Sequence, residues 1–160
     1  MKDRPRLLVV ASAGGHWVQL TRLWPAWSGA RFSVMTTKSE LKPECEGLCR
    51  ALDLPMPDFY VVPEANRWDK IRLVRSLLKI VWVVLRLRPD VVVTTGAAPG
   101  YFAVRVASLI GSRTVWIDSI ANAEELSLSG KKAGRFVDLW LTQWPDVSGP
   151  EGPQYKGSVL

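Results

Sequence analysis

Three neighbouring stretches decide the fold of this chain: Ile117-Asp118-Ser119, Leu126-Ser127-Leu128-Ser129-Gly130-Lys131 and Asp138-Leu139-Trp140-Leu141-Thr142-Gln143-Trp144-Pro145. They predict a strand, a Ser/Gly loop, a helix, a second strand and an exit from the sheet, in that order. A strand, a helix and a further strand form the repeating unit of a parallel sheet. We therefore expect this segment to be the last unit of an α/β domain, which stops where a second domain would normally begin.

The rest of the chain repeats the same alternation. Six apolar runs predict strands, at 7–11, 32–37, 59–62, 90–95, 114–117 and 139–142. Most are continuously apolar, which is typical of a parallel sheet buried on both faces. Helical patterns lie between them, at 16–27, 41–52, 68–87, 101–110 and 131–137. We predict one α/β domain over 1–160 with a Rossmann-like, doubly wound, mainly parallel sheet, and a tail or hinge at 146–160 that leads to a short strand at 158–160.

The composition limits the partners and the compartment. The 160 residues carry a net charge of +6, which favours an anionic partner: nucleic acid, a phospholipid surface or a phosphate-bearing substrate. No apolar run reaches the roughly 18 residues of a spanning helix, and 7–11 is too short for a signal peptide, so we expect a cytoplasmic protein. Cys45 and Cys49 are too few ligands for a structural zinc, and we expect two free thiols.

The turn Ser12-Ala13-Gly14-Gly15-His16 follows the first strand and opens a helix. Ligands of open α/β sheets bind at the carboxyl ends of strands, glycines let a ligand approach the backbone, and a helix N-terminus favours an anion. The turn lacks the third glycine of the dinucleotide fingerprint, so NAD binding is weakly supported. His16 is the only histidine. It is either a general base that deprotonates an acceptor hydroxyl or a loop residue that caps the helix.

Two further strand ends carry polar or small residues. Thr95-Gly96-Ala97-Ala98-Pro99-Gly100 is either a cradle for a phosphate or sugar, or a tight turn into a helix. Asp118, at the end of the fifth predicted strand, is expected at the same edge as His16. It serves as a base, orients the acceptor, or caps a loop together with Ser119.

The helical pattern at 68–87 is amphipathic and basic. Four cations lie near one face: Arg72, Arg75, Lys79 and Arg86. Apolar residues populate the other face: Ile71, Val74, Leu77, Leu78, Val81 and Leu85. One interpretation is a core helix with a solvated basic face. The other is a helix on anionic lipid headgroups, anchored by Trp68 and Trp82. Trp17, Trp24 and Trp27 line an acceptor groove, enter a bilayer, or pack in the core.

Taken together, these motifs resemble the Alg-fourteen-like family, the membrane-associated subunits of two-chain UDP-sugar transferases. The Leu126–Lys131 loop combined with Gln143-Trp144-Pro145 is the specific part of the match, and the Gly-Gly-His turn alone is not. The fold also resembles the N-terminal half of the peptidoglycan N-acetylglucosaminyltransferase, a GT-B enzyme. The resemblance implies a GT-B N-terminal, acceptor-side half-domain that supplies half of an active site.

The resemblance also implies a division of labour. This chain would bind the membrane and a polyprenyl-diphosphate-linked acceptor, while a small donor-binding subunit with a C-terminal GT-B-type domain would hold the UDP-sugar. His16 would carry over as the base of an inverting transfer, and Asp118 matches a position that is usually Glu in the family. Asn122 stands near a position that is often Arg. The residues implied to bind substrate are Ser12, Gly14, Gly15, Thr95, Gly96, Gly100, Ser119, Asn122, Ser127, Ser129 and Gly130.

The resemblance implies no metal and no cofactor, with the UDP-sugar as co-substrate, and a peripheral location on the cytoplasmic face of the inner membrane. It favours a bacterial capsule or exopolysaccharide function. Two alternatives stay open: a non-catalytic scaffold that only recruits a catalytic partner to the membrane, and a small nucleotide- or nucleic-acid-binding Rossmann protein. The latter is disfavoured, because the cations lie on an apolar helix rather than among stacking aromatic residues.

Overall fold

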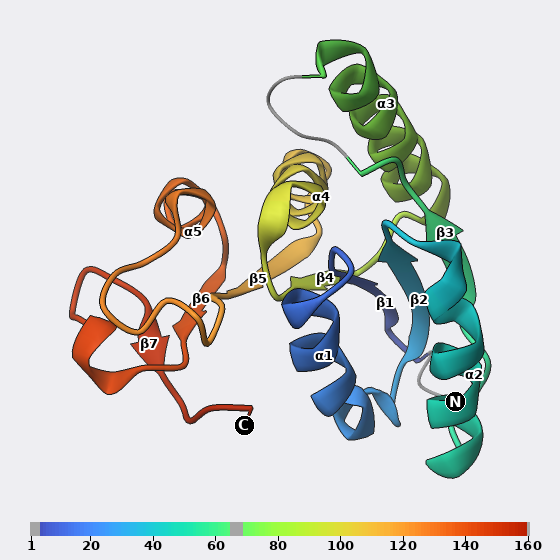
Figure 1. Cartoon of the computed structure of the whole chain (residues 1–160), viewed down its shortest axis with the longest axis horizontal. Coiled ribbons are helices and arrows are strands. Elements are labelled where there is room, and N and C mark those ends of the chain that lie inside the picture. Colours follow the sequence, from blue (N-terminus) through green and yellow to red (C-terminus); the bar gives the residue numbers. More distant parts are fainter. Residues whose placement is uncertain (1–3, 65–68, 160) are drawn as a thin grey trace.

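The computed structural model describes residues 4–64 and 69–159, which form a parallel sheet covered by helices on both faces (Figure 1). In this part of the chain seven strands pair in the order β3-β2-β1-β4-β5-β6-β7, and every pairing is parallel. Their bounds are β1 Arg6–Val10, β2 Arg31–Thr36, β3 Asp58–Val61, β4 Val91–Thr94, β5 Arg113–Ile117, β6 Leu139–Thr142 and β7 Gln154–Tyr155. The predicted doubly wound α/β fold is confirmed.

The helices divide between the two faces of the sheet. They are α1 Gly15–Arg22, α2 Lys42–Ala51, α3 Lys70–Leu87, α4 Ala97–Leu109 and α5 Leu128–Ala133, with short 3-10 turns η1 Trp24–Trp27, η2 Ser39–Leu41 and η3 Pro145–Val147. Side chains of α1, η1 and α2 pack in one core cluster, and those of α3, α4 and α5 pack in the other. The helices therefore change face between α2 and α3, and the neighbouring strands β1 and β4 are followed by helices on opposite faces.

Several boundaries differ from the sequence prediction. The helix predicted at 16–27 ends at Arg22, because Pro25 cannot continue a helical hydrogen-bond ladder and opens η1 instead. Helix α4 begins at Ala97, before the predicted 101, since Pro99 fits a first turn whose N–H groups need no partner. The strand predicted at 158–160 is wrong for Ser158 and Val159, which lie outside any strand, and Leu160 lies outside the described residues.

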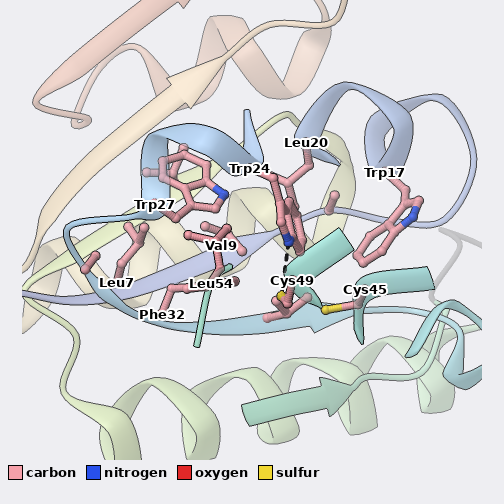
Figure 2. Close-up of a cluster of buried hydrophobic side chains, with 14 residues drawn as sticks. Leu7, Val9, Trp17, Leu20, Trp24, Trp27, Phe32, Cys45, Cys49 and Leu54 are labelled. Atoms are coloured by element: carbon pink, nitrogen blue, oxygen red, sulfur yellow. Dashed lines mark hydrogen bonds between the residues drawn. The ribbon is translucent and has the colours of Figure 1, made fainter. Parts of the chain in front are cut away.

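The first core cluster contains the three tryptophans whose role the sequence left open (Figure 2). Trp17, Trp24 and Trp27 are all buried, so they pack in the core and neither line a groove nor enter a bilayer. Trp24 stacks edge-on against Trp17 and donates a hydrogen bond from Nε1 to the Cys49 Sγ at 3.4 Å. Burial, followed by the charge of Cys49, raises the pKa of Cys45 to about 12. Both cysteines are free and buried, as predicted.

Helix α3 packs on the sheet through a different face from the one predicted. Its buried residues are Ser76, Ile80, Val83 and Val84. Five large apolar side chains are about half to two-thirds exposed, and they are named here the α3 strip: Ile71, Val74, Leu78, Trp82 and Leu85. Their spacing of three and four residues places them on one side of the helix. The interpretation of 68–87 as a core helix is therefore wrong for Ile71, Val74, Leu78 and Leu85, which face away from the core.

The four predicted cations accompany the α3 strip. Arg72, Arg75, Lys79 and Arg86 are all exposed. By helical periodicity they form a row between the α3 strip and the buried face. The guanidinium of Arg86 lies 5.4 Å from the centre of the Trp82 ring, so the basic row and the apolar strip are in contact. Trp68, the second predicted anchor, lies outside the described residues.

Candidate active site

The strand order places a candidate ligand-binding position at one edge of the sheet. The chain leaves β1 toward α1 on one face and leaves the neighbouring β4 toward α4 on the other face. Ligands of doubly wound folds bind where adjacent strands diverge in this way, outside their carboxyl ends. The turn before α1 and the turn before α4 meet at this point, and they bring His16 against Thr95.

His16 and Thr95 are joined by two reciprocal hydrogen bonds. The His16 Nδ1 lies 2.7 Å from the main-chain oxygen of Thr95, and the Thr95 hydroxyl donates to the main-chain oxygen of His16, also at 2.7 Å. A carbonyl oxygen only accepts, so in a neutral ring this contact favours the proton on Nδ1 and leaves the lone pair on Nε2. No residue in the described ranges donates to or accepts from Nε2. The ring is half-buried, and its Nε2 remains available to a ligand at the carboxyl ends of β1 and β4.

The glycines before His16 leave the start of α1 open. Gly14 has φ +87° and precedes the helix without a side-chain cap. A Cβ atom built on Gly14 or Gly15 would meet nothing within 4 Å, and both residues are exposed. Ser12 is half-buried beside them. These three predicted binding residues thus lie at an accessible helix N-terminus of the kind that accepts anionic groups.

The glycine turn before α4 is buried, whereas the glycines before His16 are exposed. The Thr95 side chain and Gly96 are buried, and Gly96 lies directly under the His16 ring. A Cβ on Gly100 would fall 2.0 Å from the Thr94 Oγ1, so this glycine lets α4 pack on β4. These three residues frame the turn and contact the protein, and their predicted role in holding a phosphate or sugar stays a prediction.

Asp118 is held by four hydrogen bonds within its own loop. The Trp116 indole and the Ser127 hydroxyl donate to Oδ1 at 3.1 and 2.6 Å, while the Ser127 N–H and the Asn122 amide donate to Oδ2 at 3.0 and 3.3 Å. Its side chain is 1% exposed. A carboxylate with this burial and this number of donors holds a loop closed and is out of reach of an acceptor hydroxyl. The contacts of Asp118 in this structure are structural, and its role as a base stays a prediction.

The other predicted residues of this loop differ in burial and in the contacts they make. Ser127 caps α5, with its hydroxyl accepting from the Gly130 N–H at 2.9 Å. Gly130 is buried, and a Cβ there would lie 2.7 Å from the Asp118 Oδ1, so the position leaves no room for a side chain. Ser119 is buried and accepts from the Ala121 N–H at 3.3 Å. Ser129 is half-buried on the first turn of α5. The loop is therefore organised mainly by its own contacts.

Two buried glutamines connect helix α1 with the loop after β5 and the end of β6. The sequence alone did not predict them as site residues. The Gln19 Oε1 accepts from the Gln143 Nε2 at 2.7 Å and from the Ile120 N–H at 3.1 Å, and its Nε2 donates to the Ser119 hydroxyl at 3.1 Å. Gln143 also donates to the Asp118 main-chain oxygen at 3.0 Å and accepts from the Val159 N–H at 2.9 Å. The available signal was a glutamine one helical turn after His16, on the otherwise apolar face of α1.

Two surface hollows of the described residues, of about 660 and 640 Å³, lie at the opposite edge, beside the amino ends of the strands, and share Arg6 in their lining. Arg6 pairs with Asp90 at 2.9 Å, and its hydrogen bonds lower the pKa of that carboxyl. Both side chains are about half exposed, so this pair contributes little to stability. Among the described residues, no cluster of three or more His, Cys, Asp or Glu side chains could hold a metal ion.

Comparison with solved structures defines the class of protein. The chain matches MurG of Acinetobacter baumannii with a TM-score of 0.72 and 12% identity, over 98% of this chain and 46% of that one. It matches UDP-N-acetylglucosamine 2-epimerase of Rickettsia bellii with a TM-score of 0.66 and 13% identity, over 98% of this chain and 45% of that one. The chain thus spans less than half of each enzyme, and it has the fold of one Rossmann-like half of a GT-B protein.

Sequence comparison then gives the family. Residues 64–159 match the family described as "Oligosaccharide biosynthesis protein Alg14 like". The Schizosaccharomyces pombe protein named "UDP-N-acetylglucosamine transferase subunit alg14" is 35% identical over 167 residues, covering 89% of this chain and 77% of that protein. The Mus musculus subunit of the same name is 29% identical over 91% of this chain and 78% of its own length. The chain belongs to the Alg14-like family, which confirms the predicted resemblance.

Proposed function

We propose that this chain is the acceptor- and membrane-binding subunit of a heteromeric inverting glycosyltransferase. The enzyme transfers a sugar from a UDP-sugar to a polyprenyl-diphosphate-linked saccharide during polysaccharide biosynthesis, at the cytoplasmic face of the inner membrane. The names of the relatives support a transferase subunit that acts with a partner. The observation that carries the proposal is His16, whose free Nε2 lies where adjacent strands diverge at the carboxyl edge of the sheet.

The proposed reaction uses His16 as the base. As the acceptor hydroxyl attacks the anomeric carbon of the donor, its proton passes to the His16 Nε2. The bond between that carbon and the diphosphate oxygen breaks, its electron pair leaves with UDP, and the configuration inverts. The partner subunit, with a C-terminal GT-B-type domain, holds most of the UDP-sugar. The exposed N-terminus of α1 at Gly14 and Gly15 stabilises negative charge beside the base.

The α3 strip and its row of cations support binding to a membrane surface. Burying one leucine side chain contributes about 1.5–3 kcal/mol, and each cation near an anionic surface adds about 1 kcal/mol. An apolar strip of five side chains flanked by four cations is the combination that lies in the headgroup region of a bilayer. In the part of the chain that the structure describes, no helix combines the length and the apolar character needed to cross a membrane.

The assignment of His16 is tested by a variant in the reconstituted enzyme. The chain is co-purified with its donor-binding partner and assayed with UDP-N-acetylglucosamine and a polyprenyl-diphosphate-linked sugar. We expect His16→Ala to lower kcat at least about 100-fold, the usual size of a general-base contribution. Val18→Ala, which truncates an exposed side chain of the same helix, serves as the control and is expected to keep full activity. Full activity of His16→Ala would instead favour the non-catalytic scaffold.

The division of labour is tested by the isolated chain in the same assay. We expect little or no turnover, because the donor-binding half is supplied by the partner. Robust turnover by the purified single chain would overturn this part of the proposal.

Membrane binding is tested by flotation with anionic vesicles. We expect Leu78→Ser, in the α3 strip, to weaken binding about tenfold or more, because a leucine leaves the hydrocarbon boundary. Leu128→Ser is the matched control, since Leu128 is as exposed but lies on α5, outside the α3 strip. Equal losses in the two variants, or no binding by the native chain, would contradict the proposed surface.

A further inference from the structure

We propose that Thr95 and Gly96 are positioning residues that hold His16 in the tautomer with the proton on Nδ1, so that Nε2 is the basic atom. The catalytic importance of this tautomer rests on the proposed function. The tautomer itself rests only on the contacts of three residues and is measurable without any transferase assay. Thr95 and Gly96 were predicted to bind substrate, but both are buried, and their contacts with His16 indicate a positioning role.

The first contact is the reciprocal pair of hydrogen bonds between His16 and Thr95. The Thr95 hydroxyl donates to the His16 main-chain oxygen at 2.7 Å, which holds the start of α1 against the end of β4. The Thr95 main-chain oxygen accepts from Nδ1 at 2.7 Å. In water a neutral histidine side chain favours the proton on Nε2. The carbonyl reverses this preference, because it cannot donate and would repel the lone pair of an unprotonated Nδ1.

The second contact is the close approach of Gly96 to the imidazole ring. A Cβ atom on residue 96 would lie 2.8 Å from the His16 Cε1 and 3.1 Å from its Nδ1, and 3.7 Å from the Trp116 ring. Gly96 also has φ +121°, a conformation that other residues rarely adopt. Its N–H donates to the Thr94 hydroxyl at 3.0 Å, which fixes the turn. Only glycine therefore lets the ring lie on this turn with Nδ1 against the carbonyl.

The arrangement has the form of a histidine oriented by a second group, as in other enzymes that activate a hydroxyl. Here the orienting group is a main-chain oxygen rather than a carboxylate. It fixes the ring and the tautomer without adding negative charge. The predicted consequence is that Gly96 and Thr95 act on the reaction only through His16.

The test uses nitrogen NMR of the isolated full chain, in which His16 is the only imidazole and its signals need no assignment. In the neutral form we expect Nδ1 to show the shift of a protonated ring nitrogen and Nε2 that of an unprotonated one. Gly96→Ala is expected to lose this pattern and show mainly the Nε2-protonated form. Gly111→Ala is the control: Gly111 has φ +82° but open space around its Cβ position, so the pattern should persist.

A protonated Nε2 in the native chain would overturn the proposal, as would a Gly96→Ala variant that keeps the native tautomer while folded. Thr95 provides a second variant that does not strain the backbone. Thr95→Val removes the hydroxyl that holds α1, and we expect kcat of the reconstituted enzyme to fall at least tenfold with an unchanged KM for the acceptor. Thr95→Ser, which keeps the hydroxyl, should restore it. A loss confined to KM would contradict positioning through His16.

The two proposals fail separately. If the neutral ring is protonated on Nδ1 but His16→Ala keeps full activity, the positioning geometry stands and the catalytic role of His16 falls. If His16→Ala is inactive but the native ring is protonated on Nε2, the proposed function stands and the assignment of Thr95 and Gly96 is wrong.

Discussion

The His16 turn and the Asp118 loop lie at the same edge of the sheet, yet they are built in opposite ways. Asp118 is 1% exposed, and both of its carboxylate oxygens accept two hydrogen bonds from within the chain. His16 is half-buried and uses one ring nitrogen to bond the protein, while the other has no hydrogen-bond partner among the described residues. One polar group completes its contacts inside the domain, and the other leaves one contact for a ligand.

The difference shows that the position of a residue at the end of a strand does not by itself identify it as a base. Both residues follow strands that point to the same edge, so both were reasonable candidates from the sequence. The decisive quantity is the number of lone pairs left over after folding. A carboxylate that accepts four donors stabilises a loop, whereas a histidine with a free Nε2 can accept a proton.

Removing the Asp118 carboxylate is expected to have the largest effect on stability. We expect Asp118→Ala to lower the free energy of unfolding by about 3 kcal/mol or more, because buried donors of Trp116 and Ser127 lose their partner. His16→Ala should lower it by only about 1 kcal/mol, since it loses one partly buried hydrogen bond. Urea denaturation of the isolated chain measures both. Equal losses would mean that the two residues have similar structural roles.

Glycine substitutions sharpen the same contrast at a smaller scale. We expect Gly130→Ala to cost about 2 kcal/mol of unfolding free energy, because the new Cβ would press on the Asp118 Oδ1 at 2.7 Å and the Ser127 Oγ at 2.9 Å. Gly15→Ala should change stability by less than about 0.5 kcal/mol, since nothing lies within 4 Å of its Cβ position. Thermal unfolding of the two variants checks this. A large loss for Gly15→Ala would show that the His16 turn is not open.

The smallest effect concerns the glutamines that join the two regions. We expect Gln19→Leu to lower the free energy of unfolding by about 1–2 kcal/mol, because the Ile120 N–H and the Gln143 amide lose a buried acceptor. The control is Arg22→Ala on the same helix, whose side chain bonds the Val159 oxygen at the exposed surface and should cost less than about 0.5 kcal/mol. Chemical denaturation followed by tryptophan fluorescence measures both. Identical values would mean that the buried network adds nothing beyond a surface contact.

Much of the fold followed from local pattern. Continuous apolar runs predicted β1 to β6, because strands covered on both faces need side chains that tolerate burial on either side. The helix termini were less predictable, since Pro99 can lie inside a first turn and Ser127 can cap a short helix. The exposed side of α3 was missed because its hydrophobic pattern covers more than one face, and periodicity cannot say which face meets the sheet.

By itself the sequence determined the parallel α/β sheet, the position of the His16 turn after the first strand, and the family to which the chain belongs. These depend on residues close together in the chain, whose spacing and turn chemistry are visible in one dimension. Three features could be seen only in the tertiary structure: Asp118 accepts hydrogen bonds from its own loop, Gln19 bonds Gln143, and Thr95 holds His16. The contacts of Gln19 and Thr95 join residues far apart in sequence, and those of Asp118 depend on how its loop folds back on itself. Which lone pairs remain free therefore depends on packing that no local pattern records.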